Sequence, residues 1–537
     1  MYDSRINKLF IEAFKSQLNI YQFKYIELVI NYMVIISITP EIALDKSINY
    51  AGGLGVLEGD KFYAAGDMGL DYLVLSLYYR GGYTKIKFHG STVVMDRESA
   101  NEEFYRSLKP GEEFTITLNN NIVYIQPWIY EYKTAKAVLF EAKCPEWARK
   151  LTDRVYIEDS DFEKNMKYVL LAKASWEYMN KYVGLENISL VDLEESYTGL
   201  ILYLMNNTLK ARIIIHTPGP WGHPLFPGDI IEREFGVKSE SIVNMTRESI
   251  KKLSEVIVVS KKQSDIIPRI FPEVAGKLKA ITNGIYLERW MDSKLYNAWL
   301  KREFNLETLK ETRLEAKREL ESLLRVYKPG VEVGNKIVIT WSRRLSRYKR
   351  PYFIARFLEE NPDLNAIVVL AGKPHPKDPD GYKYLYWFRD LSLKLRNVVY
   401  IPDYNLEVAK ILVKASDLWL FTPFSGWEAC GTSYMKALVN GVPVLSSRDG
   451  GVLEVVTDGV NGWLFGEDIR DFVNIYEDPR AKEIDEREYT EFKAKLASII
   501  DMYYNKPEKY WEIALNAWRI TPDLVDIKKV LRKYYFE

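Results

Sequence analysis

An acidic and a basic side chain, Glu428 and Lys436, stand eight residues apart in one glycine-containing segment. Between them lie Gly431, Thr432 and Ser433, small residues that precede a run of helical character. Free backbone N–H groups at the start of a helix, together with the helix dipole, favour a phosphate group. Eight residues make about two helical turns, so both charges can face one cleft if the helix begins near Gly431. The segment predicts an anion site, and a plain helix cap with a solvated lysine is the alternative.

Five cationic residues lie within nine positions directly after an apolar run. Arginine offers a planar fork of donors and lysine a compact charge, and both bind phosphate well. In α/β proteins, ligands bind at the carboxyl ends of parallel strands, where this cluster is expected to lie. The cluster predicts a second anion site, with a solvated basic loop as the alternative. The cations are Arg343, Arg344, Arg347, Lys349 and Arg350.

Two further segments stand where α/β proteins hold ligands. His216 directly follows the apolar run Ala211 to Ile215, although a purely structural histidine is equally compatible with that position. The glycine cluster Tyr50 to Asp60 follows a predicted first strand and precedes a helical pattern from Lys61 to Asp67. Glycines at such a point allow the backbone to approach a ligand closely.

Apolar runs alternate with helical patterns in both halves of the chain, which predicts an α/β protein with parallel sheets. Two Rossmann-like domains facing across a cleft are the simplest architecture. The expected strands of the first domain are Met33 to Ile38, Ile188 to Leu193, Ala211 to Ile215, Val256 to Ser260 and Lys279 to Ile285. Those of the second are Lys336 to Trp341, Ala366 to Leu370, Val398 to Ile401, Leu418 to Phe421 and Pro443 to Ser446.

Changes of pattern along the chain suggest the domain boundaries. Residues 1–290 are expected to form the first domain, with a β-rich insertion near 83–142 and helical spacing in the first thirty residues. A charged helical connector follows at 291–335, and a break at Lys328-Pro329-Gly330 ends it. Residues 336–505 form the second domain, and 506–537 are expected to be a helix that can cross back to the first.

The composition excludes several partners and suggests a compartment. Lysine plus arginine and aspartate plus glutamate number 74 each among 537 residues, so no general electrostatic attraction to nucleic acid or anionic membrane is expected. Cys144 and Cys430 support neither a disulfide framework nor a clustered metal motif, which favours a reducing, cytoplasmic setting. The apolar run Met33 to Ile38 is too short for a membrane span. The composition leaves open whether the chain forms a homo-oligomer.

These segments together resemble the α-glucan phosphorylases, especially their short archaeal and bacterial branch, from about Val34 to Gly466. Eight blocks in the order of that family are more specific than any one block. The blocks are Tyr50 to Asp60, Leu77 to Tyr83, His216 to Pro218, Asn244 to Arg247, Thr282 to Ile285 with Trp290, Arg343 to Arg350, Ala371 to Pro376 and Glu428 to Lys436.

The resemblance implies a GT-B type fold, with pyridoxal 5'-phosphate bound mainly by the second domain. It implies phosphorolysis of an α-1,4-glucan with orthophosphate, which yields glucose 1-phosphate and a shortened glucan. Lys436 would form the Schiff base. The cofactor phosphate and pocket would be lined by Gly431, Thr432, Ser433, Arg343 and Trp290. Arg344 and Lys349 would hold the substrate phosphate. The glucosyl unit would be held by His216, Asn283, Glu428, Cys430 and the backbone of Gly52, Gly53, Leu54 and Gly55.

Three departures from the family keep other functions open. The segment Leu193 to Ser196 stands where the short phosphorylases have an Asn-Glu-Gly-His-like motif, so the histidine is missing. Ser446 to Gly466 looks closer to retaining sugar-nucleotide transferases, which share the fold but commonly carry a glutamate in place of Lys436. The alternatives are therefore a sugar-nucleotide-dependent glucosyltransferase and a catalytically silent glucan-binding relative. Cys430 and Tyr434 also change the shape of the expected pocket.

Overall fold

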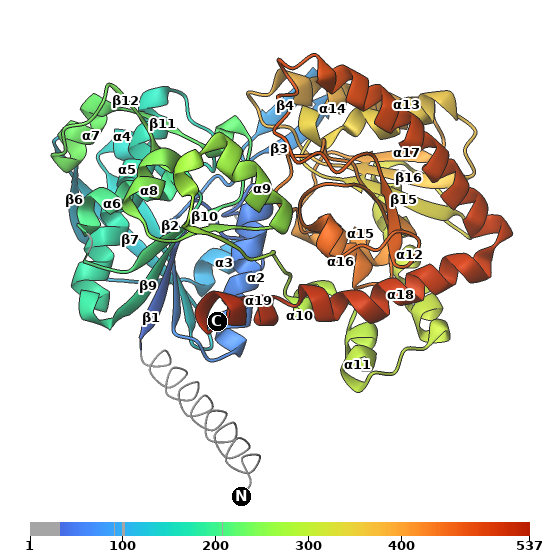
Figure 1. Cartoon of the computed structure of the whole chain (residues 1–537), viewed down its shortest axis with the longest axis horizontal. Coiled ribbons are helices and arrows are strands. Elements are labelled where there is room, and N and C mark those ends of the chain that lie inside the picture. The colour runs from blue at the N-terminus through green and yellow to red at the C-terminus, as the bar shows by residue number, and fades with distance from the viewer. Residues whose placement is uncertain (1–32, 91, 99–101, 207) are drawn as a thin grey trace, which may run out of the picture.

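The computed structural model describes residues 33–90, 92–98, 102–206 and 208–537. The helical pattern predicted in the first thirty residues lies outside this part of the chain. Two α/β domains lie side by side, and the last helices run along the second domain and return to the first (Figure 1). The predicted fold class, two Rossmann-like domains of GT-B type, is confirmed.

A parallel sheet forms the centre of the first domain, with the strand order β14-β13-β10-β9-β1-β2-β8. Most of its strand residues are apolar, because helices cover both faces. The order reverses between β1 and β9, and such a reversal opens a crevice at the carboxyl ends of the strands. The strands are β1 (Val34–Ile38), β2 (Tyr72–Leu77), β8 (Ala135–Cys144), β9 (Ile188–Glu194), β10 (Ala211–Ile215), β13 (Val256–Val258) and β14 (Leu278–Ala280).

Helices pack on both faces of this sheet and connect its strands in the doubly wound manner. The glycine cluster begins α2 itself, whereas the sequence predicted a helix only from Lys61. The helices are α2 (Gly53–Asp67), α3 (Glu102–Ser107), α4 (Glu146–Leu151), α5 (Asp161–Tyr178), α6 (Leu202–Met205), α7 (Gly228–Phe235), α8 (Met245–Lys252) and α9 (Lys261–Ile270). A short antiparallel pair, β11 (Leu225–Pro227) with β12 (Ile242–Asn244), lies beside α7, which connects the two strands.

The β-rich region near 83–142 has two parts. β5 (Lys109–Pro110), β6 (Phe114–Leu118) and β7 (Asn121–Tyr132) extend the central sheet with antiparallel pairing, while β8 belongs to its parallel part. The hairpin of β3 (Lys85–His89) and β4 (Thr92–Asp96) instead reaches the second domain, where Phe88 packs against Tyr400 (Figure 1).

The second domain repeats the doubly wound order in a purely parallel sheet, β17-β16-β15-β18-β19-β20. Its reversal lies between β15 and β18. The strands are β15 (Ile337–Ser342), β16 (Ala366–Ala371), β17 (Val398–Ile401), β18 (Leu418–Phe421), β19 (Val444–Ser447) and β20 (Gly462–Phe465). The helices between them are α13 (Pro351–Glu360), α14 (Pro379–Lys394), α15 (Leu406–Ala415) and α16 (Ser433–Leu438).

Helices join the two domains at both ends of the second one. The connecting segment contains α10 (Leu287–Trp290), α11 (Ser293–Lys301) and α12 (Leu306–Tyr327). A break at Arg302 separates α11 from α12, where the sequence suggested one helical run. The chain ends with α17 (Arg480–Asn505), α18 (Pro507–Val525) and α19 (Ile527–Tyr535). α19 packs on α2, and the Tyr535 hydroxyl donates to Asp192 of the first sheet at 2.9 Å.

No helix within the described ranges is long and apolar enough to cross a membrane. The same part of the chain holds no group of three or more histidine, cysteine or acidic side chains that could hold a metal ion.

Candidate active site

A carboxylate with two cations marks the switch point of the second sheet. Arg343 follows β15, Lys349 lies in the turn after it, and Glu428 follows β18. Oε2 of Glu428 accepts hydrogen bonds from Arg343 Nη2 at 2.6 Å and from Lys349 Nζ at 2.7 Å. Burial opposes ionisation, but these two charges lower the pKa of Glu428 to about 2. Burial and the Arg343 charge lower the pKa of Lys349 to about 7, against the attraction of Glu428.

Arg343 has capacity for another anion. Its Nη1 is buried and has no hydrogen-bond partner among the described residues, and its guanidinium lies 3.8 Å from the ring of Phe421. A Cβ atom at Gly431 would lie 2.7 Å from Oε1 of Glu428 and 3.0 Å from Nη2 of Arg343. Only glycine therefore fits at Gly431, because its backbone approaches both charged groups.

Lys436 lies on α16, and its side chain is buried beside the domain junction. Its Nζ is 3.9 Å from the ring centroid of Trp290. Trp290 Nε1 donates to Asp60 at 2.8 Å, and Arg289 Nη1 donates to the same carboxylate at 3.1 Å. Burial lowers the pKa of Lys436 to about 8, with Asp60 raising it and Arg289 lowering it. A lysine with this pKa holds a useful fraction of free amine near neutral pH.

Arg344 differs from the other cations of its cluster. Its side chain is exposed at the interface between the domains and forms no ion pair among the described residues. The surrounding protein partly shields the guanidinium from water, which opposes its protonation, but the nearby Tyr348, Tyr83 and Glu41 raise the pKa of Arg344 above its usual range. It is therefore a permanent cation.

His216 follows β10 and is held by a chain of buried charges. Its Nε2 lies 2.5 Å from Oε2 of Glu194, which ends β9. The other oxygen of Glu194 pairs with Lys61, which also pairs with Glu58 at 3.0 Å. Burial opposes ionisation of Glu194, but Lys61 and His216 lower its pKa to about 2. The network fixes the orientation of the imidazole ring and leaves Nδ1 for another contact.

The glycine turn forms the first turn of α2, which corrects the loop expected from the sequence. A Cβ at Gly52 or Gly53 would meet nothing within 4 Å, whereas one at Gly55 would lie 2.9 Å from Oε2 of Glu41. That carboxylate also accepts from the backbone N–H groups of Ala51 and Gly52. Part of the backbone predicted to bind sugar is therefore occupied by Glu41, while open space lies over Gly52 and Gly53.

Asn283 and Cys430 lie at the interface between the domains, and Thr432 lies at the start of α16. Asn283 Nδ2 donates to the backbone oxygen of Cys430 at 3.1 Å, so it joins the two domains. Burial raises the pKa of the Cys430 thiol to about 12, and the thiol is therefore neutral. The helix after Gly431 begins at Ser433, two residues later than expected, and Thr432 at its N-cap makes no side-chain capping bond.

Several neighbours of these groups were not predicted as site residues. Asp60 and Gly59 belong to the glycine-rich block, and that block was the only sign in the sequence that they lie near the site. The pairing of Asp60 with Trp290 could not be predicted, because it joins residues far apart in the chain. Asp449 accepts from the N–H groups of Gly426 and Glu428, at 2.7 and 2.8 Å, and so holds the loop of Glu428. Lys262 of α9 lies 3.5 Å from Asp449 and couples the first domain to that loop.

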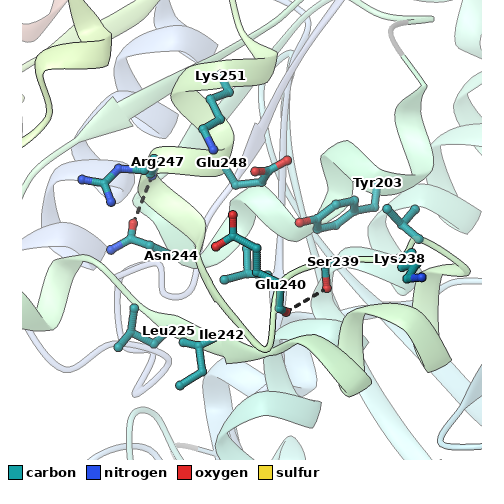
Figure 2. A pocket seen from close by; sticks show the side chains of 12 residues that line it. Tyr203, Leu225, Lys238, Ser239, Glu240, Ile242, Asn244, Arg247, Glu248 and Lys251 are labelled. Carbon is teal, nitrogen blue, oxygen red and sulfur yellow. Dashed lines mark hydrogen bonds between the residues drawn. The ribbon is translucent and has the colours of Figure 1, made fainter.

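A hollow of about 540 Å³ lies elsewhere, on the first domain around α8 and the β11–β12 pair. Figure 2 shows polar and aliphatic side chains around it, and none of the predicted site residues is among them. Its lining is Tyr203, Leu225, Val237, Lys238, Ser239, Glu240, Ile242, Val243, Asn244, Arg247, Glu248 and Lys251.

The class of protein follows from the fold and one sequence match. Residues 328–478, most of the second domain, match the family "Glycosyl transferases group 1". Two doubly wound domains with charged groups at both switch points fit a glycosyltransferase of GT-B type.

The relatives narrow this class. The chain is 26% identical to a maltodextrin phosphorylase of Thermococcus litoralis over 81% of its length, and 25% identical to a glycogen phosphorylase of Aquifex aeolicus over 81%. It is 23% identical over 90% of its length to an uncharacterized protein of Methanocaldococcus jannaschii, of which it covers 95%. It spans 62% of the Thermococcus protein and 76% of the Aquifex one. The predicted resemblance to the glycogen and maltodextrin phosphorylases is confirmed.

Proposed function

We propose that this chain is a pyridoxal phosphate-dependent α-glucan phosphorylase, which transfers the terminal glucosyl unit of an α-1,4-glucan to orthophosphate with retention. The observation that carries the proposal is the buried amine of Lys436. Its pKa is about 8 and it lies over the ring of Trp290, and a Schiff base requires an amine that is partly neutral in this way. The names of the relatives support the same reaction.

The residues present fit the cofactor. Lys436 would hold it covalently, and Trp290 offers an aromatic face beside the amine. Arg343 has a buried, unpartnered Nη1 among the described residues, which suits a phosphate oxygen. Gly431 keeps the backbone close to that guanidinium. When bound, pyridoxal phosphate would supply a phosphate group that can relay a proton to the substrate phosphate.

The substrate phosphate would be bound by Arg344 and Lys349. Arg344 is free of ion pairs within the described residues, and Lys349 lies beside it with a pKa of about 7. Glu428 holds Lys349 and Arg343 in place and prevents their mutual repulsion from opening the site. Preorganised cations of this kind stabilise the negative charge of phosphate in the transition state.

The glucosyl unit would lie between His216 and the start of α2. Glu194 fixes the imidazole, and the space over Gly52 and Gly53 allows a sugar ring to approach the backbone. Contacts such as Asn283 with Cys430 and Lys262 with Ser425 at 2.6 Å join the domains around this region. A closed interface excludes the water that would hydrolyse a glucosyl intermediate.

A sugar-nucleotide-dependent glucosyltransferase is the second candidate. The match of residues 328–478 to the group 1 glycosyl transferases favours it. The pairing of Arg343 and Lys349 with Glu428 would serve a nucleotide diphosphate as well as orthophosphate. Lys436 opposes it, because a sugar-nucleotide transferase has no need of a buried reactive amine.

The absorption spectrum of the purified protein before and after borohydride separates these candidates. A phosphorylase should show a reducible chromophore, pyridoxyl label on the Lys436 peptide and phosphate-dependent release of glucose 1-phosphate from maltooligosaccharide. Elongation of glucan from a nucleotide sugar, without a reducible chromophore, would establish the second candidate and refute the first.

A further inference from the structure

Glu195 adopts a backbone conformation that a residue with a side chain rarely takes. Its φ is +67° and its ψ is 157°, a region populated almost only by glycine. The surroundings enforce this conformation, because its N–H donates to Ile214 O at 3.0 Å and its carbonyl accepts from Thr198 N and Oγ1. Such strain persists where the fold overdetermines it, and it is concentrated at functional sites.

The carboxyl group of Glu195 is buried beside His216 and only partly satisfied. The residue is 6% exposed, and its Oε1 accepts from the Thr217 hydroxyl at 2.6 Å. Oε2 is buried without a hydrogen-bond partner among the described residues. Burial raises the pKa of Glu195 to about 7, against the nearby His216 charge and the Thr217 hydrogen bond. At neutral pH this carboxyl can therefore both accept and donate hydrogen bonds.

A second strained residue lies in the same neighbourhood. Tyr156 has φ +55°, and its hydroxyl donates to Oε1 of Glu41 at 3.2 Å. The charge of Glu195 is among those that raise the pKa of Tyr156, after burial and Glu41. Glu41 in turn accepts from Gly52 at the start of α2. Two unfavourable backbone conformations thus present polar side chains to one region, at the carboxyl ends of β1, β9 and β10.

The chemistry of this region fits a neutral polyhydroxyl ligand. Glu41 and Glu195 bring carboxyl groups to this region, and carboxyl oxygens pair well with adjacent sugar hydroxyls. An aromatic side chain lies close by: Trp221, 39% exposed, accepts through its backbone oxygen from the Tyr197 hydroxyl at 3.1 Å. Its ring packs at 5.4 Å from Tyr348 of the second domain, which precedes Lys349.

Other nearby polar residues are already occupied. Ser196, which follows Glu195, is fully buried and accepts from Thr246 at 2.6 Å. Both ring nitrogens of His223 have partners, the hydroxyl of Thr246 and the backbone oxygen of Pro218. Glu195 is therefore the group next to His216 that has an oxygen to offer.

We infer that the Glu195 carboxyl binds ring hydroxyls of the α-glucan and so determines which glucan is accepted, an inference that rests on the proposed function. It follows that this chain retains a strained glutamate at a position suited to glycine because the carboxyl is needed for the substrate. Stability and binding should then respond in opposite directions when the residue is changed.

The test compares Glu195→Gly, Glu195→Gln and the control Asn120→Gly in the holoprotein. Asn120 also has positive φ, +58°, but lies in the exposed turn before β7, next to β6 on the far side of the first domain (Figure 1). Calorimetry gives the midpoint of thermal unfolding, and titration with maltopentaose without phosphate gives Kd. Glu195→Gly should raise the midpoint and weaken binding at least about tenfold, the effect of losing a hydrogen bond to a charged group. Glu195→Gln should weaken binding less.

Asn120→Gly should leave the Kd for maltopentaose unchanged and should not lower the midpoint of thermal unfolding. An unchanged Kd in Glu195→Gly would overturn the inference, and so would a wild-type chain with no affinity for maltopentaose. A lower midpoint in Glu195→Gly would show that the carboxyl is required for folding instead. A further outcome separates this inference from the proposed function. If the wild-type chain binds maltopentaose but forms no glucose 1-phosphate, and the Glu195 variants lose that binding, the proposed function is refuted while Glu195 remains a glucan ligand.

Discussion

Lys436 should capture pyridoxal 5'-phosphate with a pH dependence centred near pH 8. Burial lowers the pKa of this amine from the ordinary 10.5 to about 8. Only the neutral amine attacks an aldehyde. At pH 7 a pKa of 8 leaves about one amine in ten neutral, and a pKa of 10.5 leaves about three in ten thousand. Burial of Lys436 therefore provides roughly 300 times more reactive amine than an exposed lysine would.

The perturbation that tests this reasoning is Asp60→Asn. The Asp60 carboxylate raises the pKa of Lys436, so its neutralisation should move the midpoint of capture to a lower pH. Asparagine keeps an acceptor oxygen for Trp290. Asp67→Asn is the matched control, because Asp67 ends the same helix and pairs instead with Lys528 at 3.0 Å.

The assay starts from protein freed of its resident cofactor. Pyridoxal 5'-phosphate is added at a series of pH values, borohydride stops the reaction, and the pyridoxyl label on the Lys436 peptide is measured. Wild type and Asp67→Asn should share a midpoint near pH 8, and Asp60→Asn should lie below it. A wild-type midpoint near 10.5, or an identical midpoint in Asp60→Asn, would refute the reasoning.

Three further outcomes are expected. Arg344→Ala should reduce kcat/KM for orthophosphate, measured as glucose 1-phosphate release, by a transition-state loss of about 2–4 kcal/mol. The affinity for glucan should stay unchanged. A kcat/KM equal to that of wild type would show that Arg344 does not belong to the phosphate site. Glu428→Gln removes the charge that raises the pKa of Lys349, so the alkaline limb of the pH–rate profile should move to lower pH, and an unmoved limb would contradict this role. Trp221→Ala removes an exposed ring that packs on Tyr348 and Trp427 of the second domain, with ring centroids 5.4 and 5.5 Å apart. It should raise KM for long glucans more than KM for orthophosphate, and equal changes in the two KM values would argue against a glucan contact.

Most of the parallel strands were predictable, because buried parallel strands are short apolar runs between polar turns, but β2 and β20 were not among those expected. β10, β17 and β18 have the bounds predicted from the sequence, and other predicted strands shift by a few residues. The start of α2 was not predicted, because glycine is a poor helix former. A Cβ at Gly59 would lie 2.2 Å from the backbone oxygen of Ala43, so tertiary packing, not helix propensity, selects glycine there.

The sequence predicted which residues form the candidate site, but not which of them pair with one another. Arg343, Lys349 and Glu428 were expected to bind separate groups, yet the structure joins them in one ion-pair cluster. Which carboxylate meets which cation depends on how β15 and β18 are placed side by side, and no local pattern records that. The strain at Glu195 was equally invisible, since a glutamate in sequence carries no sign of its φ.

Substitutions of Lys436 test whether its surroundings penalise the charged amine, and whether they accept a carboxylate less well. In the cofactor-free chain, Lys436→Met should raise the free energy of unfolding at pH 7 by about 3 kcal/mol, because the folded state holds the lysine proton less tightly than the unfolded chain does. The lysine's penalty is complete below pH 8 and disappears as the pH rises towards 10.5, so the two stabilities should converge there.

Lys436→Glu should instead lower the stability well below that of Lys436→Met, because a second carboxylate would face Asp60 in a buried environment. In a sugar-nucleotide transferase a glutamate is the ordinary residue at this position, so the pocket of such an enzyme would accept it. Chemical unfolding of the three proteins between pH 7 and pH 10 measures the difference. If Lys436→Glu is as stable as Lys436→Met, then Asp60 does not disfavour a carboxylate at this position, and the structural argument for a buried lysine as the centre of this site fails.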